Sequence, residues 1–221
     1  MSGFFIRRIA ASGPEVKESE IVFERGVNII YGQSNTGKSV AVMCLKFMFS
    51  SKDVPQIVLA SGYETISMTL ENEKGETLVV NRAMVMTDKG PKGDSSMDVI
   101  SSIEDIPSGR YSNDHNAKKN YNDVLLKLLG ISESFKIIGA KNRTGKALTV
   151  KGFSHQFLLD KGRIGQTESI LINPGENFSN ETYNLNAFIY LLTGEHEEPT
   201  EEETPNRKTC YLKSRGLPEI F

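Results

Sequence analysis

The sequence predicts an α/β fold with an antiparallel β subdomain. First, the apolar run VNIIY (27–31) leads through a glycine-containing loop into KSVAVMCLKFMF (38–49), which predicts a buried strand followed by a helix packed on several sides. Second, residues 63–85 alternate apolar and polar side chains across the turn signal NEKG, the pattern of a β-hairpin. Third, apolar residues recur at helical spacing between residues 116 and 129.

Further strands are predicted from β-branched and aromatic residues between turn formers. FFIRRIAASG and SEIVFERG form two of them, joined by a turn at Gly13-Pro14, and a loop at 88–96 precedes a third, MDVISSI. KALTVKGF forms another strand later in the chain. These segments cover residues 4–13, 19–26, 97–103 and 146–153.

The helix at 116–129 ends at Gly130, a residue suited to a helix C-terminus. Its apolar face consists of Tyr121, Val124, Leu125, Leu128 and Leu129. SHQFLLDKGRI is expected to be a turn leading to a short helix, and NLNAFIYLLTG a helix that ends at Gly194.

The predicted domain organisation is one lobe over residues 1–195, with a β-rich insertion at about 60–105, followed by an acidic tail over 196–221. The segment EHEEPTEEETPNRK holds six glutamates, two prolines and no apolar residue. Such a composition does not support a packed core, so the tail is expected to be disordered.

Composition excludes several classes of protein. The chain has 221 residues, 38% hydrophobic and 24% charged, and a formal net charge of -2, which gives no whole-chain attraction to nucleic acid or membrane. Two cysteines and three separated histidines form no disulfide or metal framework. No apolar stretch is long enough for a membrane span or a signal peptide, so a cytoplasmic location is expected.

The loop between the first predicted buried strand and its helix matches the phosphate-binding pattern G-x-x-x-x-G-K-[ST]. Glycines allow the backbone N–H groups to wrap phosphates, and the helix N-terminus favours anions. Lys38 is expected to reach the β- and γ-phosphates of ATP, and Ser39 to bind Mg²⁺. The predicted nucleotide-binding residues are Gly32, Gln33, Ser34, Asn35, Thr36, Gly37, Lys38, Ser39 and Val40.

A later segment, GAKNRTGKA (139–147), does not meet the same requirements. Gly139 lies one residue too far upstream, and Ala147 replaces the hydroxyl that the metal needs. We interpret it as a basic loop.

The segments GVNIIYGQSNTGKS, FSHQFLLDKGRI and AFIYLLTGE resemble the ATPase heads of the SMC, RecF and RecN clan, close to the ABC class. The chain looks like the N-terminal half of such a head in bacterial SMC-like "AAA family ATP-binding" proteins, from about residue 4 to 195. The resemblance implies Mg-ATP binding and a second head or a C-terminal half as partner. It also implies ATP hydrolysis in DNA repair or defence by the complete protein.

The chain departs from that family after Gly194, where neither heptads nor a Walker B strand with paired carboxylates is found. No catalytic residue is therefore assigned, and feeble hydrolysis is expected from the chain alone. The resemblance makes Gln156 a candidate for the glutamine that senses the γ-phosphate and Mg²⁺. His155, Asp160 or a plain helix-surface role for Gln156 are the alternatives. A non-hydrolysing nucleotide-binding or interaction module, a truncated remnant and a small P-loop kinase remain alternative functions.

Three weaker candidates have two interpretations each. Arg7 and Arg8 either reach phosphate or form a solvated pair on the face of a strand, and Tyr31 either stacks on the base or belongs to the core. A basic cluster either faces DNA or is solvated, and it lacks the interleaved aromatic residues of a nucleic-acid surface. The cluster comprises Lys118, Lys119, Lys141, Arg143 and Lys146.

Overall fold

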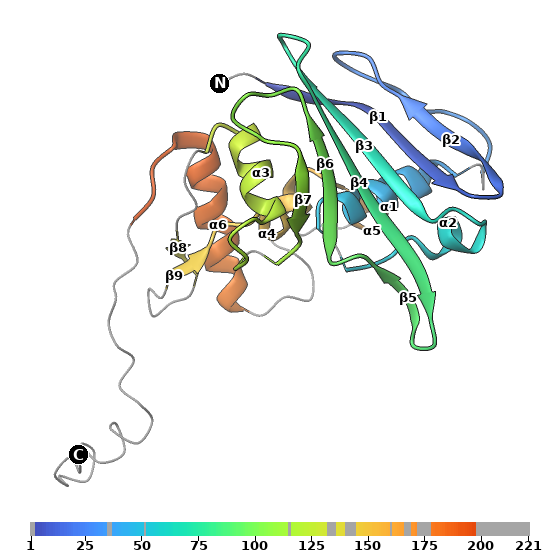
Figure 1. Ribbon diagram of the computed structural model, residues 1–221. Coiled ribbons are helices and arrows are strands. Elements are labelled where there is room, and N and C mark those ends of the chain that lie inside the picture. Colours follow the sequence, from blue (N-terminus) through green and yellow to red (C-terminus); the bar gives the residue numbers. More distant parts are fainter. Residues whose placement is uncertain are drawn as a thin grey trace, which may run out of the picture.

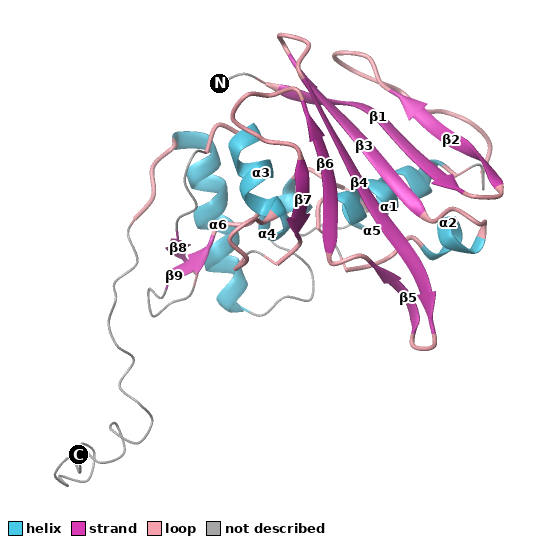
Figure 2. Cartoon of the chain, in the orientation of Figure 1, coloured by secondary structure: helices cyan, strands magenta, loops and turns pink. Residues whose placement is uncertain are grey.

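The computed structural model describes residues 3–34, 37–50, 52–114, 116–131, 136–139, 145–159, 161–165, 169–171 and 178–197. Its main element is an antiparallel sheet in the order β2-β1-β3-β4-β6-β7, with β5 paired to the end of β4 (Figures 1 and 2). The strands are β1 (Phe4–Gly13), β2 (Val16–Val22), β3 (Thr65–Asn72), β4 (Thr77–Thr87), β5 (Gly90–Gly93), β6 (Ser96–Ser101) and β7 (Gly109–Ser112).

The helices are α1 (Lys38–Met48), α2 (Gln56–Ala60), α3 (Tyr121–Leu128), α4 (Val150–Phe153), α5 (Lys161–Ile164) and α6 (Phe178–Thr193). A 3₁₀ turn, η1 (Ser154–Gln156), follows α4, and β8 (Lys136–Ile138) pairs with β9 (Gly145–Ala147) in a separate ribbon. Helices α1 and α3 lie on one side of the main sheet (Figure 2), whereas α4 contacts α3, and α6 contacts α4 and β8.

The hairpin predicted at 63–85 is confirmed as β3 and β4. Buried and partly exposed side chains alternate along both strands, as expected for a sheet with one covered face. Gly75 adopts φ +77° in the connecting turn, a conformation that glycine reaches without a steric penalty. The β-rich region predicted at about 60–105 shares a sheet with the N-terminal strands, because β3 also pairs with β1 along its length. One sheet therefore holds both parts.

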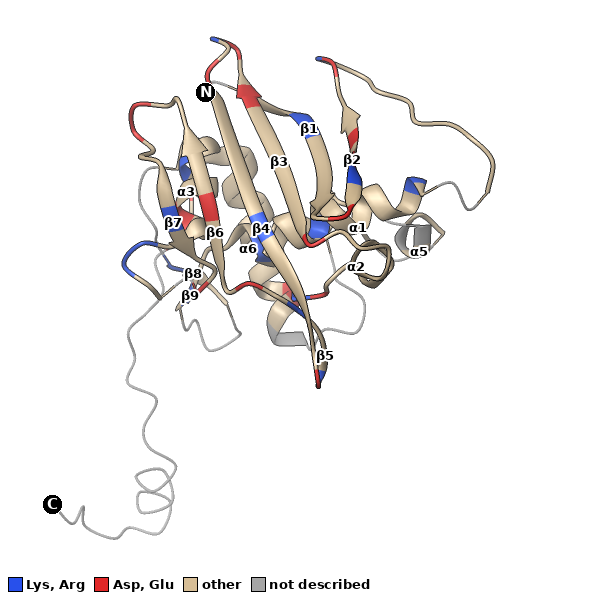
Figure 3. Ribbon diagram, turned by 45° about the vertical axis from the view of Figure 1, so that its right-hand side comes forward, with Lys and Arg blue, Asp and Glu red and all other residues tan. Residues whose placement is uncertain are grey.

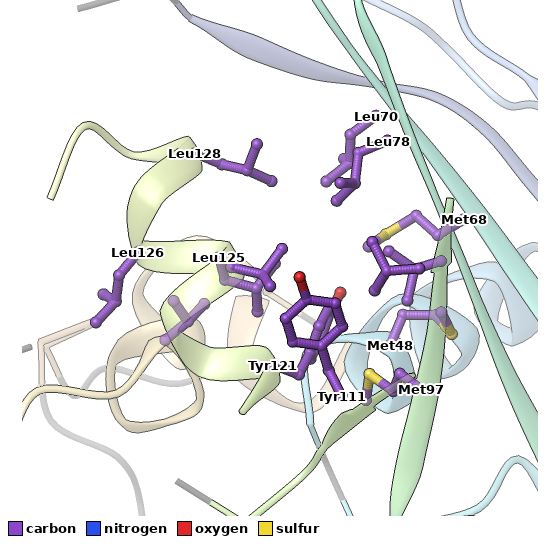
Figure 4. Close-up of a cluster of buried hydrophobic side chains, with 14 of the residues drawn as sticks. Met48, Met68, Leu70, Leu78, Met97, Tyr111, Tyr121, Leu125, Leu126 and Leu128 are labelled. Carbon is purple, nitrogen blue, oxygen red and sulfur yellow. The ribbon is translucent and has the colours of Figure 1, made fainter. Parts of the chain in front are cut away.

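The core lies between the sheet and its helices. Phe47 and Met48 of α1 are fully buried against the sheet. Figure 4 shows sheet residues facing α3. Met68, Leu70 and Leu78 come from the sheet, and Leu125 and Leu128 come from the helix. The prediction that α1 packs on several sides is wrong for the described residues. Its buried residues share one face, whereas Met43 on another face is 49% exposed.

Helix α3 begins later than its predicted start at residue 116. Asn120 is its N-cap, and the Asn120 side chain accepts a hydrogen bond from the backbone N–H of Asp123 at 2.9 Å. Gly130 ends the helix at φ +79°, as predicted. Leu126 replaces Leu129 in the predicted buried face, with Leu129 45% exposed and Leu126 only 1%.

The predicted strand KALTVKGF is wrong in its second half. Strand β9 ends at Ala147, and the Thr149 side chain then accepts a hydrogen bond from the N–H of Gly152 at 3.1 Å, capping α4. The short helix α5 and the later helix α6 are confirmed, and Gly194 adopts φ +73° just after α6. Most of the predicted acidic tail, from residue 198 onward, lies outside the described residues.

The buried strand predicted at 27–31 is wrong. The segment has no strand assignment, and Val27, Ile29 and Tyr31 are 92%, 80% and 91% exposed. No described strand lies beside it to complete a ladder. The Asn28 side chain instead bonds the backbone N–H and C=O of Glu24, at 2.9 and 2.7 Å. An isolated strand cannot bury its side chains or pair its backbone groups, which explains why the apolar pattern alone misled.

Candidate nucleotide-binding site

The predicted phosphate-binding loop lies between this exposed segment and the N-terminus of α1. Gly37 is the N-cap of α1 and adopts φ +85°, so the loop turns into the helix through a left-handed residue. The backbone N–H of Val40 donates to the C=O of Gly37 at 2.9 Å, which closes the first turn. Asn35 and Thr36 lie outside the described residues.

Lys38 is directed back across the loop. Its ammonium donates to the C=O of Gly32 at 2.9 Å and to the C=O of Gln33. A cation therefore sits within the turn at the N-terminus of α1, where the helix dipole adds positive potential. Ser39 is exposed in the first turn of α1. Within the described residues no three acidic, cysteine or histidine side chains gather as a metal site, so a Mg²⁺ ion here would depend on Ser39 and on ligand phosphates.

A cleft of about 720 Å³ extends from the loop between β1, β2, α1 and α2. Gly32, Gly37 and Lys38 line one end. Tyr31 also lines the cleft, so it does not belong to the core. Ser61 and Tyr63, just after α2, complete the wall. Sequence reasoning missed these two residues, because no motif marks them and only the folding of α2 against the sheet brings them to the loop.

Cys44 lies on the α1 wall of this cleft and is 6% exposed. Burial raises the pKa of its thiol to about 11, because the thiolate would lose its hydration. The neutral Cys44 thiol contributes fully to the free energy of unfolding below the pKa that this thiol has in the unfolded chain. The contribution is lost as pH rises through its pKa of about 11 in the folded protein.

We therefore expect Cys44 to resist iodoacetamide at pH 8 in the folded protein and to react in urea. Peptide mass spectrometry after timed alkylation measures this, with the same peptide from urea-denatured protein as the reference. Alkylation of Cys44 in folded protein at the rate seen in urea would contradict the burial of this wall.

Arg7 and Arg8 are held by β1, β2 and their neighbours. Arg7 donates to the C=O of Phe23 at 2.7 Å and pairs with Glu24 at 2.8 Å. Arg8 pairs with Glu18 and Glu20, and its hydrogen bond to Glu20 raises the pKa of the guanidinium. These contacts favour the strand-face interpretation of both arginines. Glu20 is the only carboxylate residue among the described residues that line the cleft, and this ion pair holds it.

Gln156 is placed away from the loop cleft and does not line it. Its side-chain amide donates to the C=O of Asn184 on α6 at 3.0 Å. His155 lies 3.2 Å from the C=O of Leu171 through Nε2, and Asp160 lies outside the described residues. A role for Gln156 toward γ-phosphate or Mg²⁺ stays a prediction.

The predicted basic cluster does not come together among the described residues. Lys118 and Lys119 line a cleft beside α3, and Lys119 lies 4.7 Å from the centre of the Tyr111 ring. Lys146 lines a different cleft and donates to Asn180 at 3.0 Å. Lys141 and Arg143 fall outside the described part. Basic and acidic residues are interspersed along the ribbon in Figure 3.

Comparison with known proteins gives one informative similarity. The chain is 29% identical over 83 residues to the DNA double-strand break repair Rad50 ATPase of Thermoplasma acidophilum. The match covers 36% of this chain and 9% of that protein, so the chain corresponds to a small part of its relative. No protein-family model and no solved structure matches. The chain is similar in part to a Rad50 ATPase.

This partial similarity supports a relationship to SMC/Rad50-like ATPases at the level of a shared segment. The similarity is consistent with the expected ATP binding, because the name of the relative describes an ATPase of DNA repair. In the part of the chain that the structure describes, no helix is long and apolar enough to cross a membrane.

Proposed function

We propose that this chain is the Mg-ATP-binding N-terminal lobe of an SMC-like ATPase head, with the α/β fold of P-loop proteins. The observation that carries the proposal is the sequence GQSNTGKS, which leads through Gly37 into α1 with the Lys38 ammonium inside the turn. The partial similarity to a Rad50 ATPase supports the same assignment. In the complete protein, ATP hydrolysis would serve a DNA transaction such as repair or defence.

The lobe needs a second lobe to work. Phosphoryl transfer requires a group that positions the attacking water, and the only carboxylate lining the described part of the cleft is paired with Arg8. The exposed apolar residues Val27, Ile29 and Tyr31 lie directly before the loop. A strand from a second lobe would pair with this segment and turn it into the buried strand that its composition favours. That lobe would also supply the missing carboxylates.

Equilibrium binding of ATP with and without Mg²⁺ tests the proposal. We expect micromolar binding that Mg²⁺ strengthens, together with negligible phosphate release. Ser39→Ala should remove most of the Mg²⁺-dependent gain, because the hydroxyl is the metal ligand that the protein contributes. Isothermal titration calorimetry measures the gain as the ratio of the two dissociation constants.

Ser108→Ala serves as the matched control, since Ser108 is an exposed serine whose hydrogen bonds go to Ser101. Its Mg²⁺-dependent gain should equal that of the wild type. If Mg²⁺ strengthened ATP binding equally in the wild type, Ser39→Ala and Ser108→Ala, Ser39 would not be a ligand of the metal. Rapid turnover by the isolated chain would contradict the need for a second lobe, and phosphate transfer to a nucleoside would identify a kinase instead.

A non-hydrolysing nucleotide-binding module is the second candidate. The ion-paired state of Glu20 favours it, because that carboxylate is not available to orient water. The two candidates differ once a second lobe carrying a Walker B strand is added. An ATPase lobe then gains phosphate release, whereas a pure binding module does not.

A further inference from the structure

A second cleft, also of about 720 Å³, lies near the opposite end of α1 from the phosphate-binding loop. Ser50 and Lys52, just after α1, form one wall, and β5 with the residues that follow it forms another. Ala147, at the end of β9, and Thr149, the N-cap of α4, contribute the third. Among the described residues, none lines both this cleft and the loop cleft.

The lining of this second cleft is cationic, although the chain as a whole has a net charge of -2. Of the described residues that line it, five are basic and two are acidic, and one of the acidic residues, Asp94, pairs with Arg110 at 2.6 Å. A concave wall of one charge sign concentrates counter-ions, so anions are the expected ligands. The basic residues are Lys52, Arg82, Lys92, Lys146 and Lys151.

Arg82 places a fixed positive charge in the wall of the cleft. It is 3% exposed, donates to the C=O of Phe47 at 2.6 Å, and its guanidinium lies 3.9 Å from the centre of the Phe47 ring. Burial lowers its pKa to about 10, which still leaves it charged at neutral pH. Part of its charge offsets the negative end of the α1 dipole, so the four lysines provide most of the attraction for a ligand.

Lys146 is positioned as well, because it donates to Asn180 at 3.0 Å and lies 4.5 Å from the centre of the Tyr183 ring. Lys92 and Lys151 are exposed at the rim and are free to turn toward a ligand. The cleft therefore has two positioned cations in its wall, Arg82 and Lys146, and two exposed lysines at its mouth that can change conformation when a ligand binds.

Asn113 supplies a different kind of contact. Its side-chain oxygen is buried and has no hydrogen-bond partner, whereas its backbone N–H donates to the C=O of Ser95 at 2.7 Å. A buried acceptor without a partner costs free energy, and that cost is recovered when the Asn113 side chain turns its oxygen toward a donor in the cleft. A sugar hydroxyl is a suitable donor, and the serine and threonine hydroxyls of the cleft add further polar contacts.

We propose that this cleft binds a phosphorylated sugar, as in a free mononucleotide, with its phosphate at the lysines and a sugar hydroxyl donating to Asn113. The cleft volume lies within the range of small-molecule sites, which favours a small ligand over an extended polymer. The site is separate from the phosphate-binding loop and goes beyond the proposed ATPase function.

The experiment uses the full chain carrying Lys38→Ala, so that the loop site does not contribute. AMP and inorganic phosphate are titrated calorimetrically into this protein, into the same protein with Lys92→Ala and Lys151→Ala, and into a control with Lys17→Ala and Lys74→Ala. The control lysines are exposed, and neither lines the cleft. All three proteins should give the same far-UV circular dichroism.

We expect AMP to bind the Lys38→Ala protein and the rim pair to weaken it at least about tenfold, because charge-assisted contacts to phosphate are lost. The control pair should leave AMP binding unchanged. Asn113→Ala should weaken AMP but not inorganic phosphate, which a merely structural effect would not do. Absence of AMP binding, or equal losses in the rim and control pairs, overturns the proposal.

Single-stranded nucleic acid is the other source of phosphate groups, and titration with a twelve-nucleotide oligothymidylate tests for it. If it binds more tightly than AMP, and the rim pair reduces the slope of log K against log salt by about 1.4, the ligand is a single strand and the small-molecule assignment is overturned. ATP binding at the loop of the wild-type protein is measured separately, so failure of either site is seen independently of the other.

Discussion

Lys38→Ala should weaken Mg-ATP binding by about 100-fold or more, equivalent to about 2.7 kcal/mol. The Lys38 ammonium lies in the turn of the loop, where it donates to the C=O groups of Gly32 and Gln33. When ATP binds, its phosphate oxygens would replace these carbonyls as acceptors and form stronger, charge-assisted hydrogen bonds. Alanine removes the charge without altering the glycines that shape the loop.

The matched control for this substitution is Lys46→Ala, which removes a second ammonium from the same helix two turns away. Its affinity for Mg-ATP should stay within about twofold of the wild type, because charges beyond the first turn act weakly on the N-terminus. Calorimetry or a fluorescent ATP analogue measures both variants. Equal affinity in Lys38→Ala and wild type would exclude the loop as the nucleotide site.

The second large effect is expected on stability. Phe47→Ala should reduce the free energy of unfolding by about 3–5 kcal/mol, a large fraction of the total for a domain of this size. The Phe47 ring is fully buried and packs beneath the Arg82 guanidinium. It also lies against the backbone of Gly93, since a Cβ atom built there would come within 2.6 Å of the ring. Alanine would leave a cavity and uncover a buried cation.

Urea denaturation followed by circular dichroism measures this change as a shift of the midpoint. Met43→Ala is the control on the same helix, because Met43 is 49% exposed and its loss should cost about 1 kcal/mol or less. A Phe47→Ala midpoint equal to that of Met43→Ala would show that α1 does not dock on the sheet as described. Since α1 also carries Lys38, such a result would weaken the geometry of the loop as well.

Local sequence patterns correctly predicted the elements whose formation depends only on residues close together in the chain. The β3–β4 hairpin needs only its turn and its alternating faces, and α3 needs only its apolar stripe and Gly130. The predicted start of α3 was too early because the Asn120 cap, rather than the apolar period, determines where the helix begins. The strand expected at 146–153 ended early for the same kind of reason, the competing cap at Thr149.

The G-x-x-x-x-G-K-[ST] motif was also recognisable in the sequence from the spacing of Gly32, Gly37, Lys38 and Ser39, and its binding of phosphate stays a prediction. Its surroundings were not. Residues 27–31 have the composition of a buried strand, but burial depends on a neighbouring strand that no local pattern can specify.

The sequence by itself predicted the hairpin and the main helices, and it identified the G-x-x-x-x-G-K-[ST] motif whose binding of phosphate stays a prediction, because each depends on residues close together in the chain. Only the tertiary structure decided which surfaces these elements share. It placed Ser61 and Tyr63 beside the loop, Gln156 against α6, and Arg82 with four lysines around a second cleft. These groupings join residues far apart in sequence, and they depend on how the helices pack on the sheet and on each other.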